Sequence, residues 1–263
     1  MIDVLKRNNV NIIGKGDKVI LFAHGFGCSQ NAWKRIISSF AEEYKLVLFD
    51  YVGAGKSDIS AYDNSRYNSL DGYAMDIIEI CDELKIKDAI FIGHSVSAMI
   101  GALVAIKHPC IFKKLIFIAP SPCYINEEGY VGGFEKEDID ALLELMENDF
   151  ASFTKSMVPV IVANPSQPEL ADEMENNFCT TDKEILKQFA RITFLSDNRK
   201  DLPDIPVESL TLQCSEDIIA PTEVGKYINE NTPKNKLVIL QATGHCPHMS
   251  APEETINNIK SFL

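Results

Sequence analysis

One pentapeptide in the first half of the chain, Gly93-His94-Ser95-Val96-Ser97, has the residue types of a nucleophile elbow. Such an elbow is a tight turn between a strand and a helix that lifts a serine hydroxyl above the edge of a sheet. A glycine before the turn keeps side-chain bulk away from strained backbone. Ser97 stands where the usual G-x-S-x-G pattern has its second glycine. Because serine is also small, we still predict that Ser95 is a nucleophile.

Two later residues could activate this serine. A hydroxyl is a poor nucleophile at neutral pH and needs an adjacent base that a third group orients. With this kind of elbow the three residues come in the order serine, acid, histidine. Asp217 and His245 each follow a predicted strand, so they should lie at the same sheet edge as Ser95. We predict that His245 takes the proton and that Asp217 orients it. Glu216 is the rival acid and is expected to point away.

The segment His24–Gly27 ends the first long apolar run and resembles an H-G-x-G oxyanion loop. Acyl transfer develops negative charge on a carbonyl oxygen, and backbone amides can stabilise that charge. We predict that the amides of Phe26 and Val96 form this oxyanion hole. His24 and His94 lie in or beside these segments, and we interpret both as structural histidines rather than proton carriers.

Two other motifs suggest chemistry that we do not expect. Residues 53–57 end like a phosphate-binding loop, but the first glycine of G-x-x-x-x-G-K-S would fall at Asp50. We therefore predict a tight strand-to-helix turn there and no nucleotide. Residues 245–248 (His-Cys-Pro-His) offer metal ligands, yet no second cluster completes a tetrahedral set. We expect neither a metal nor another cofactor, and we interpret Cys246 as a buried, inert thiol.

Hydrophobic runs indicate the elements that position these residues. Strands buried on both faces of a parallel sheet are continuous apolar runs. The chain has six of them: Val19–His24, Lys45–Tyr51, Ala89–His94, Lys114–Pro120, Ser209–Cys214 and Lys236–Ala242. Helical patterns lie between the first four: Asn31–Phe40, Leu70–Leu84 and Val96–His108. This alternation predicts an α/β fold with a mostly parallel central sheet flanked by helices.

The alternation stops in the middle of the chain, where only helix-like stretches occur, at Asp138–Asp149 and Asp182–Ser196. We therefore predict an all-helical cap (lid) of residues 123–203, inserted into a core of residues 1–122 and 204–263. The cap carries 17 acidic and 7 basic residues, which is −10 of the chain's formal charge of −13. A solvated helical surface explains this charge. An acidic lid that meets a partner is the alternative.

Length and composition narrow the class of protein. The chain has 263 residues, of which 46% are apolar and 24% charged, the balance of a folded globular protein with one large core. Its longest apolar stretch, Ala98–Ile106, is far short of the ~20 residues that a membrane span needs. The acidic balance argues against nucleic acid as a partner. Residues 1–7 lack a signal-peptide pattern and the seven cysteines include no C-x-x-C, so we expect a reduced, cytoplasmic protein.

With these motifs in place, the chain resembles the α/β-hydrolase superfamily over nearly its whole length. Within it, the chain is most similar to the RsbQ branch, the bacterial energy-stress regulators that are related to the plant strigolactone and karrikin receptors. The matching stretches are His24–Gln30, Leu48–Gly53, Leu70–Ala74, Gly93–Val96, Pro120–Asn126, Gly132–Glu135, Cys214–Pro221 and Gly244–Ser250. The hydrolase motifs occur in many unrelated enzymes, whereas residues 120–124 and 244–250 are much more particular to the branch.

The resemblance implies a cap of four helices over a small apolar pocket. It implies that Phe26 and Val96 line this pocket together with residues from the insertion: Tyr124, Phe134, Phe153, Met157 and Phe194. For each cap residue, a place in a helix core is the alternative, because both environments need apolar side chains. In the RsbQ branch the hydrolase acts with a PAS-domain phosphatase of the PP2C type, which activates the general-stress sigma-factor (sigma-B) pathway. The implied partners are therefore a small apolar ligand and such a phosphatase.

Three functions follow from these observations. The first is a serine hydrolase that cleaves or binds a small apolar ester or lactone and regulates stress signalling. The second is an ordinary cytosolic carboxylesterase without a signalling partner, and the third is a ligand receptor with vestigial hydrolysis. Haloalkane dehalogenases and epoxide hydrolases use the same scaffold, but they need an aspartate where Ser95 stands.

Overall fold

The computed structural model describes residues 3–263, and the side chains of all of these residues except 179 and 180. Met1 and Ile2, which begin the segment examined for a signal pattern, lie outside the described residues, as does the side chain of Cys179. Within the described chain, no helix combines the length and the apolar character needed to cross a membrane.

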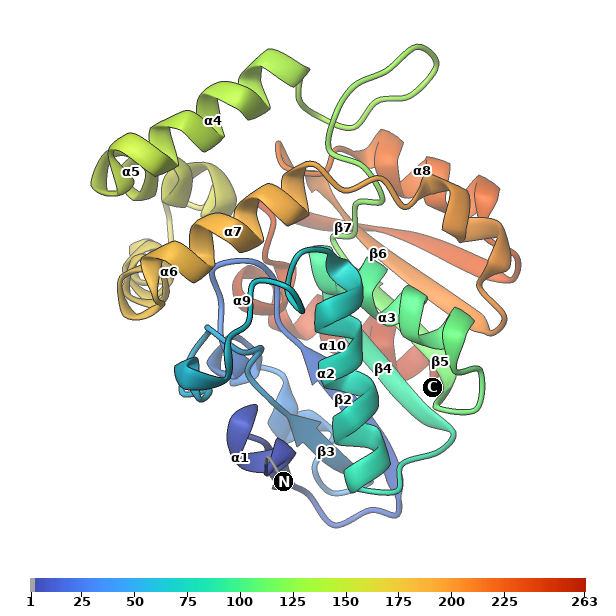
Figure 1. Ribbon diagram of the computed structural model, residues 1–263. Helices are drawn as coiled ribbons and strands as arrows, with labels where there is room; N and C mark the ends of the chain where they lie inside the picture. Colours follow the sequence, from blue (N-terminus) through green and yellow to red (C-terminus); the bar gives the residue numbers. More distant parts are fainter. Residues whose placement is uncertain (1–2) are drawn as a thin grey trace.

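The described residues form one sheet of seven strands in the order β1-β3-β2-β4-β5-β6-β7 (Figure 1). The strands are β1 (Asn11–Ile13), β2 (Lys18–Ala23), β3 (Tyr44–Leu48), β4 (Ala89–His94), β5 (Phe112–Ile118), β6 (Glu208–Glu216) and β7 (Asn235–Thr243). Only β1 runs antiparallel to its neighbour. The six predicted strands and the mostly parallel sheet are confirmed. β1 has no sequence signal because all three of its residues are exposed at the sheet edge.

Helices cover both faces of the sheet (Figure 1), which is why its central strands are mainly apolar. The helices of the core are α1 (Val4–Arg7), α2 (Leu70–Glu83), α3 (Val96–Lys107), α8 (Thr222–Asn231), α9 (Pro247–Ser250) and α10 (Pro252–Phe262). In β2, Leu21 and Ala23 pack into the apolar cluster that includes α2 and α3. Ile20 and Phe22 point the other way, into the cluster that includes α10. Each face therefore buries every second side chain of the strand.

The predicted helix at Asn31–Phe40 is wrong. The structure has two short 3-10 turns there, Gln30–Trp33 and Ile37–Ser39, and further turns of this kind at Ile59–Ala61 and Arg199–Asp204. The amides of Lys34, Ile36 and Phe40 each donate to the carbonyl three residues before them. Trp33, Ile36 and Phe40, which are three and four residues apart, are buried by these turns. A run that contains two isoleucines and two serines also has weak helix propensity.

Four helices follow one another between β5 and β6: α4 (Lys136–Asn148), α5 (Phe150–Val162), α6 (Pro168–Thr180) and α7 (Lys183–Phe194). Figure 1 shows them, from yellow-green to orange, gathered on one side of the molecule. Their apolar side chains form a cluster that also contains core residues such as Cys28, Ile219 and Cys246. The cap therefore packs onto the core through apolar contacts. The division of the chain at residues 123 and 203 stays a prediction.

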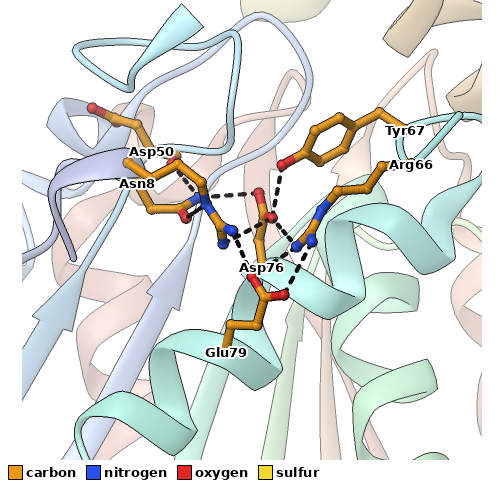
Figure 2. A network of polar contacts seen from close by, with 7 residues as sticks. Asn8, Asp50, Arg66, Tyr67, Asp76 and Glu79 are labelled. Atoms are coloured by element: carbon orange, nitrogen blue, oxygen red, sulfur yellow. Dashed lines mark hydrogen bonds and ion pairs between the residues drawn. The ribbon is translucent and has the colours of Figure 1, made fainter. Parts of the chain in front are cut away.

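A buried polar network joins the N-terminal segment to α2 (Figure 2). Its members are Arg7, Asn8, Asp50, Arg66, Tyr67, Asp76 and Glu79. The carboxylate of Asp76 is fully buried, and both arginines approach it to within 3.2 Å. Both arginines also pair with Glu79. The amide of Asn8 donates to the Asp76 carboxylate at 3.0 Å and to the Asp50 carbonyl at 3.1 Å. The network therefore holds Asp50, in the loop that follows β3.

Candidate active site

Ser95 occupies the turn between β4 and α3. Its φ of +56° and ψ of −125° lie outside the regions that residues with a side chain usually adopt. Such strain persists only where the surrounding structure enforces it. Here the strand before the turn and the helix after it are both buried. A side chain at Gly93 would lie 2.7 Å from the Ser97 carbonyl oxygen. The turn is therefore tight enough to present the Ser95 hydroxyl at the sheet edge.

The structure brings Ser95, His245 and Asp217 into one chain of hydrogen bonds. His245 Nε2 lies 2.8 Å from Ser95 Oγ, and His245 Nδ1 lies 2.7 Å from Asp217 Oδ2. A carboxylate only accepts, so Nδ1 carries the proton and Nε2 is free to accept the proton of Ser95. This is the geometry that a serine nucleophile and its base require.

The carboxylate of Asp217 is held from both sides. Its Oδ1 accepts hydrogen bonds from the amides of Ile219 at 2.9 Å and Ala220 at 3.2 Å, and the side chain is fully buried. Its Oδ2 is left for His245. Glu216, the rival acid, is exposed at the end of β6. Asp217 is therefore the carboxylate that faces the imidazole.

The two predicted oxyanion amides belong to segments that adjoin the nucleophile. Val96 begins α3, where a helix leaves its first amides without intrahelical acceptors. Within the described chain, the amides of Phe26 and Val96 donate to no other protein group. A side chain at Gly25 would lie 3.3 Å from Ser95 Cβ. The loop that carries Phe26 therefore lies directly against the elbow.

A cavity opens beside Ser95 under the cap. Of the predicted pocket residues, Phe26, Tyr124, Met157 and Phe194 line it. Further lining side chains that the sequence did not indicate are Ile161, Met174 and Thr193 of the cap with Cys28, Ile219 and Cys246 of the core. The volume of this cavity is about 20 Å³. The cavity is thus small and mainly apolar.

Three predicted pocket residues do not line this cavity. Val96 is buried at the start of α3. Phe134 packs against Phe194 with ring centroids 6.4 Å apart, and Phe153 packs against Phe178 at 6.0 Å. Both phenylalanines thus lie behind the cavity wall, in the apolar cluster of the cap. A cavity wall and a helix core need the same apolar residues, so the sequence pattern could not separate them.

The hydroxyl of Tyr124 is a neighbour of the nucleophile that the sequence did not reveal. Tyr124 Oη lies 3.2 Å from Ser95 Oγ. Because the Ser95 proton faces His245, the tyrosine is the donor in this pair. Burial raises the pKa of Tyr124, so its proton stays in place. A larger hollow of about 630 Å³ lies between α2 and α7, but it contains none of these residues.

The remaining motifs have structural roles in the described chain. Asp50 Oδ2 accepts the Lys56 amide at 3.0 Å, so the turn at residues 53–57 already has an anionic partner within the chain. Burial raises the pKa of Cys28 to about 12 and that of Cys246 well above its usual value, which keeps both thiols protonated. Among the described residues, no group of three or more metal-ligating side chains comes together.

Three buried histidines remain neutral in the folded chain. His24 donates from Nδ1 to the Gly25 carbonyl at 2.9 Å and accepts the Tyr51 amide at Nε2. His94 donates from Nε2 to the His245 carbonyl at 2.8 Å. Burial lowers the pKa of all three histidines. The pKa of His248 falls to about 3, mainly through burial, with smaller contributions from His245 and Arg35. These rings therefore support the site without carrying charge.

This burial predicts a loss of stability in acid. The unfolded chain binds a proton at position 248 below pH ~6.5, whereas the folded chain does so only near pH 3. The contribution of His248 to the free energy of unfolding is therefore fully present above pH ~6.5. Below that pH it is lost by about 1.4 kcal/mol per pH unit. Urea unfolding at pH 7 and pH 5 should differ by about 2 kcal/mol through His248 alone. His248→Gln should lower that pH dependence, and an unchanged dependence would contradict the assignment.

The cap contacts the candidate site through the backbone of His245. The His245 amide donates to the carbonyl of Ile161, in the last turn of α5, at 2.8 Å. A side chain at the preceding Gly244 would lie 2.1 Å from the Val162 carbonyl oxygen. The end of α5 therefore lies directly on the segment that carries His245.

Comparisons with known proteins show a family and a fold that this chain shares. A family model described as the alpha/beta hydrolase fold matches residues 18–252. The chain is 34% identical to a karrikin insensitive 2 receptor of Petunia hybrida, over 96% of this chain and 94% of the relative. It is 36% identical to a strigolactone esterase of Pisum sativum, over 99% and 98%. The structure of a hydrolase from Oleispira antarctica matches with a TM-score of 0.97 and 39% identity, over 99% of this chain and 96% of that one.

Proposed function

The chain belongs to the alpha/beta hydrolase fold family, and on that premise we propose that it is a serine hydrolase of small apolar carboxylic esters or lactones. The observation that carries the proposal is the hydrogen-bonded chain from Asp217 through His245 to Ser95 beneath an apolar cavity. Relatives named as esterases support the reaction type. No metal or other cofactor enters the proposal.

In the proposed reaction, Ser95 Oγ attacks the carbonyl carbon of the ester while His245 Nε2 takes its proton. The amides of Phe26 and Val96 donate to the oxyanion that forms. Collapse of this intermediate breaks the bond to the alkoxide, which takes the proton from His245 and leaves an acyl-Ser95 ester. A water molecule then attacks the acyl carbon while His245 Nε2 takes its proton. When the bond to Ser95 Oγ breaks, His245 returns this proton to the serine and the acid is released. Asp217 stabilises the imidazolium in both halves.

The size of the cavity limits the substrate class. The closed site has room for few atoms beyond the protein, so a substrate enters only when the cap moves away from the core. The apolar lining favours an acyl or lactone part without charge. The division into a core of residues 1–122 and 204–263 and a cap of residues 123–203 is part of this proposal.

A covalent-intermediate experiment tests the proposal. The protein is mixed with p-nitrophenyl acetate, butyrate and octanoate, and quenched samples are digested for mass spectrometry. We expect acylation of Ser95, with higher kcat/KM for the acetate and butyrate than for the octanoate. p-Nitrophenyl phosphate is the control and should not be turned over. Acylation of another residue alone, or release of p-nitrophenol no faster than in buffer, contradicts the proposal.

We further propose that hydrolysis serves signalling, as in the RsbQ type, with a PAS-domain PP2C-type phosphatase as partner and the sigma-B stress response as its output. The similarity to a karrikin insensitive 2 receptor, a relative that is named as a receptor, favours this second candidate. The excess of acidic residues in the cap offers a surface for a protein. The six cysteines whose side chains are described are free thiols, which supports a cytoplasmic site of action.

Capture from lysate of the native host tests the signalling candidate. Tagged wild-type protein and a Ser95→Ala variant, each with and without p-nitrophenyl acetate, are used as baits. We expect a PAS-domain phosphatase with the wild-type protein. Recovery with both baits would favour a receptor in which ligand occupancy is the signal. Recovery with neither, together with turnover of simple esters, would favour an ordinary carboxylesterase.

A further inference from the structure

Ser97 makes two hydrogen bonds that a glycine at the same place could not make. Its side chain is fully buried, and its Oγ donates to the His24 carbonyl at 2.5 Å. Tyr51 Oη lies 2.9 Å from the same Oγ. Because the one hydroxyl proton of Ser97 is used on His24, the tyrosine must donate to Ser97. We call the chain from Tyr51 Oη through Ser97 Oγ to the His24 carbonyl the Ser97 bridge.

The Ser97 bridge joins the nucleophile helix to the oxyanion loop. Ser97 belongs to the first turn of α3, and His24 stands two residues before Phe26. The His24 ring adds two further contacts, because its Nε2 accepts the Tyr51 amide at 3.3 Å and its Nδ1 donates to the Gly25 carbonyl. His24 is therefore held by its ring and by its backbone, and Tyr51 contributes to both.

Tyr51 is itself fixed by its neighbours. Its ring packs edge-on against Phe49 and Tyr73, with centroids 5.0 and 5.5 Å apart. The residue before it, Asp50, accepts the Gln30 amide at 2.8 Å and the Asn9 side chain at 2.7 Å. The Asp50 carbonyl belongs to the buried network of Figure 2. The bridge thus begins from a part of the core that several independent contacts hold in place.

The loop that the bridge holds has little freedom elsewhere. A side chain at Gly25 would lie 2.4 Å from His94 Nδ1, so this residue already touches the elbow. At Gly27, with φ of +67°, a side chain would lie 2.5 Å from the Phe178 ring of the cap. The loop is packed between elbow and cap by van der Waals contact alone on these sides. The Ser97 bridge adds a hydrogen bond between the backbone of this loop, at His24, and the first turn of α3.

We propose that Ser97, with Tyr51, is a positioning residue that holds the oxyanion loop so that the amides of Phe26 and Val96 converge on one oxygen atom. The inference rests on the proposed function, since it concerns the same oxyanion. Donors must lie within about 2.7–3.1 Å of the developing charge, and loss of one donor lowers kcat by about 10²–10³-fold. Loosening the loop should cost part of that factor.

Ser97→Ala and Tyr51→Phe are the variants that test the proposal. We expect Ser97→Ala to lower kcat for p-nitrophenyl acetate by about 10- to 100-fold and Tyr51→Phe by about 3- to 10-fold, with KM changed less than about threefold. The binding of butylboronic acid, which forms a tetrahedral adduct with the serine, should weaken by the same factor as kcat/KM. If Ser97 had a merely structural role, the affinity for the tetrahedral adduct would not fall more than the affinity for the ester substrate.

Ser209→Ala is the matched control, because the Ser209 hydroxyl is equally buried but bonds to Asn235 away from the site. It should lower the melting temperature and leave kcat and boronate affinity within about twofold. The proposal is overturned if Ser97→Ala keeps both values within twofold, or if Ser209→Ala loses as much. If Ser97→Ala does not fold, an unchanged Tyr51→Phe overturns it. Turnover that survives in Ser95→Ala would instead reject the proposed function.

Discussion

Replacement of Ser95 by alanine is expected to lower kcat for p-nitrophenyl acetate by about 10⁴- to 10⁶-fold. The variant has no nucleophile at the elbow, so the route through an acyl-serine is closed. What remains is the contribution of the oxyanion hole and of substrate binding, which leaves a rate somewhat above that in water. The measurement is steady-state release of p-nitrophenol, with the same preparation checked for acylation by mass spectrometry.

The folded state is the control for this variant. Alanine removes one oxygen atom whose partners are His245 and Tyr124, so the thermal unfolding midpoint should stay close to that of the wild-type protein. Wild-type rates in a folded Ser95→Ala protein would show that another group is the nucleophile. Cys246 would then be the first residue to test, because it lines the same cavity.

Asp217→Asn is the second change with a large expected effect, a loss in kcat of about 10⁴-fold. In the native site all three contacts of the carboxylate come from donors: the amides of Ile219 and Ala220 and Nδ1 of His245. An asparagine must therefore turn its own NH₂ group toward one of them. If it faces the imidazole, the proton of His245 moves to Nε2, which can then no longer accept from Ser95. The loss should appear in kcat, with little change in KM.

Glu216→Gln provides the matched control, since it also removes one carboxylate charge from the end of β6, but on an exposed side chain. Its kcat should stay within about twofold of the wild-type value. If Glu216→Gln lost as much activity as Asp217→Asn, the assignment of the acid would be wrong. Equal melting temperatures of the two variants would show that folding does not cause the difference.

Much of the fold can be predicted because its signals are local. The six parallel strands are continuous apolar runs, since each central strand is covered on both faces. The turn at Ser95 joins one such run to a helix and has small residues around it. The carboxyl ends of parallel strands share one edge, so Asp217 and His245 could be placed near Ser95 from chain order alone.

Other features have no local signal. The edge strand β1 is short and exposed, and the turns at residues 30–39 bury Trp33 and Ile36 in a helix-like spacing without forming an α-helix. Phe134 and Phe153 have the same residue type as the cavity-lining Phe194, yet they lie behind the cavity wall. Residue type tells that a side chain is apolar, but not which apolar surface it meets.

The sequence by itself determined the sheet and the elbow, because each depends on a pattern within a few neighbours. It also placed Asp217 and His245 near Ser95, because the carboxyl ends of parallel strands share one edge. Only the tertiary structure decided which side chains surround Ser95 and what Ser97 does. The contact from Ser97 to His24 spans 73 positions, and that from Tyr124 to Ser95 spans 29. Contacts over such separations depend on how whole elements pack, which no short stretch of residues encodes.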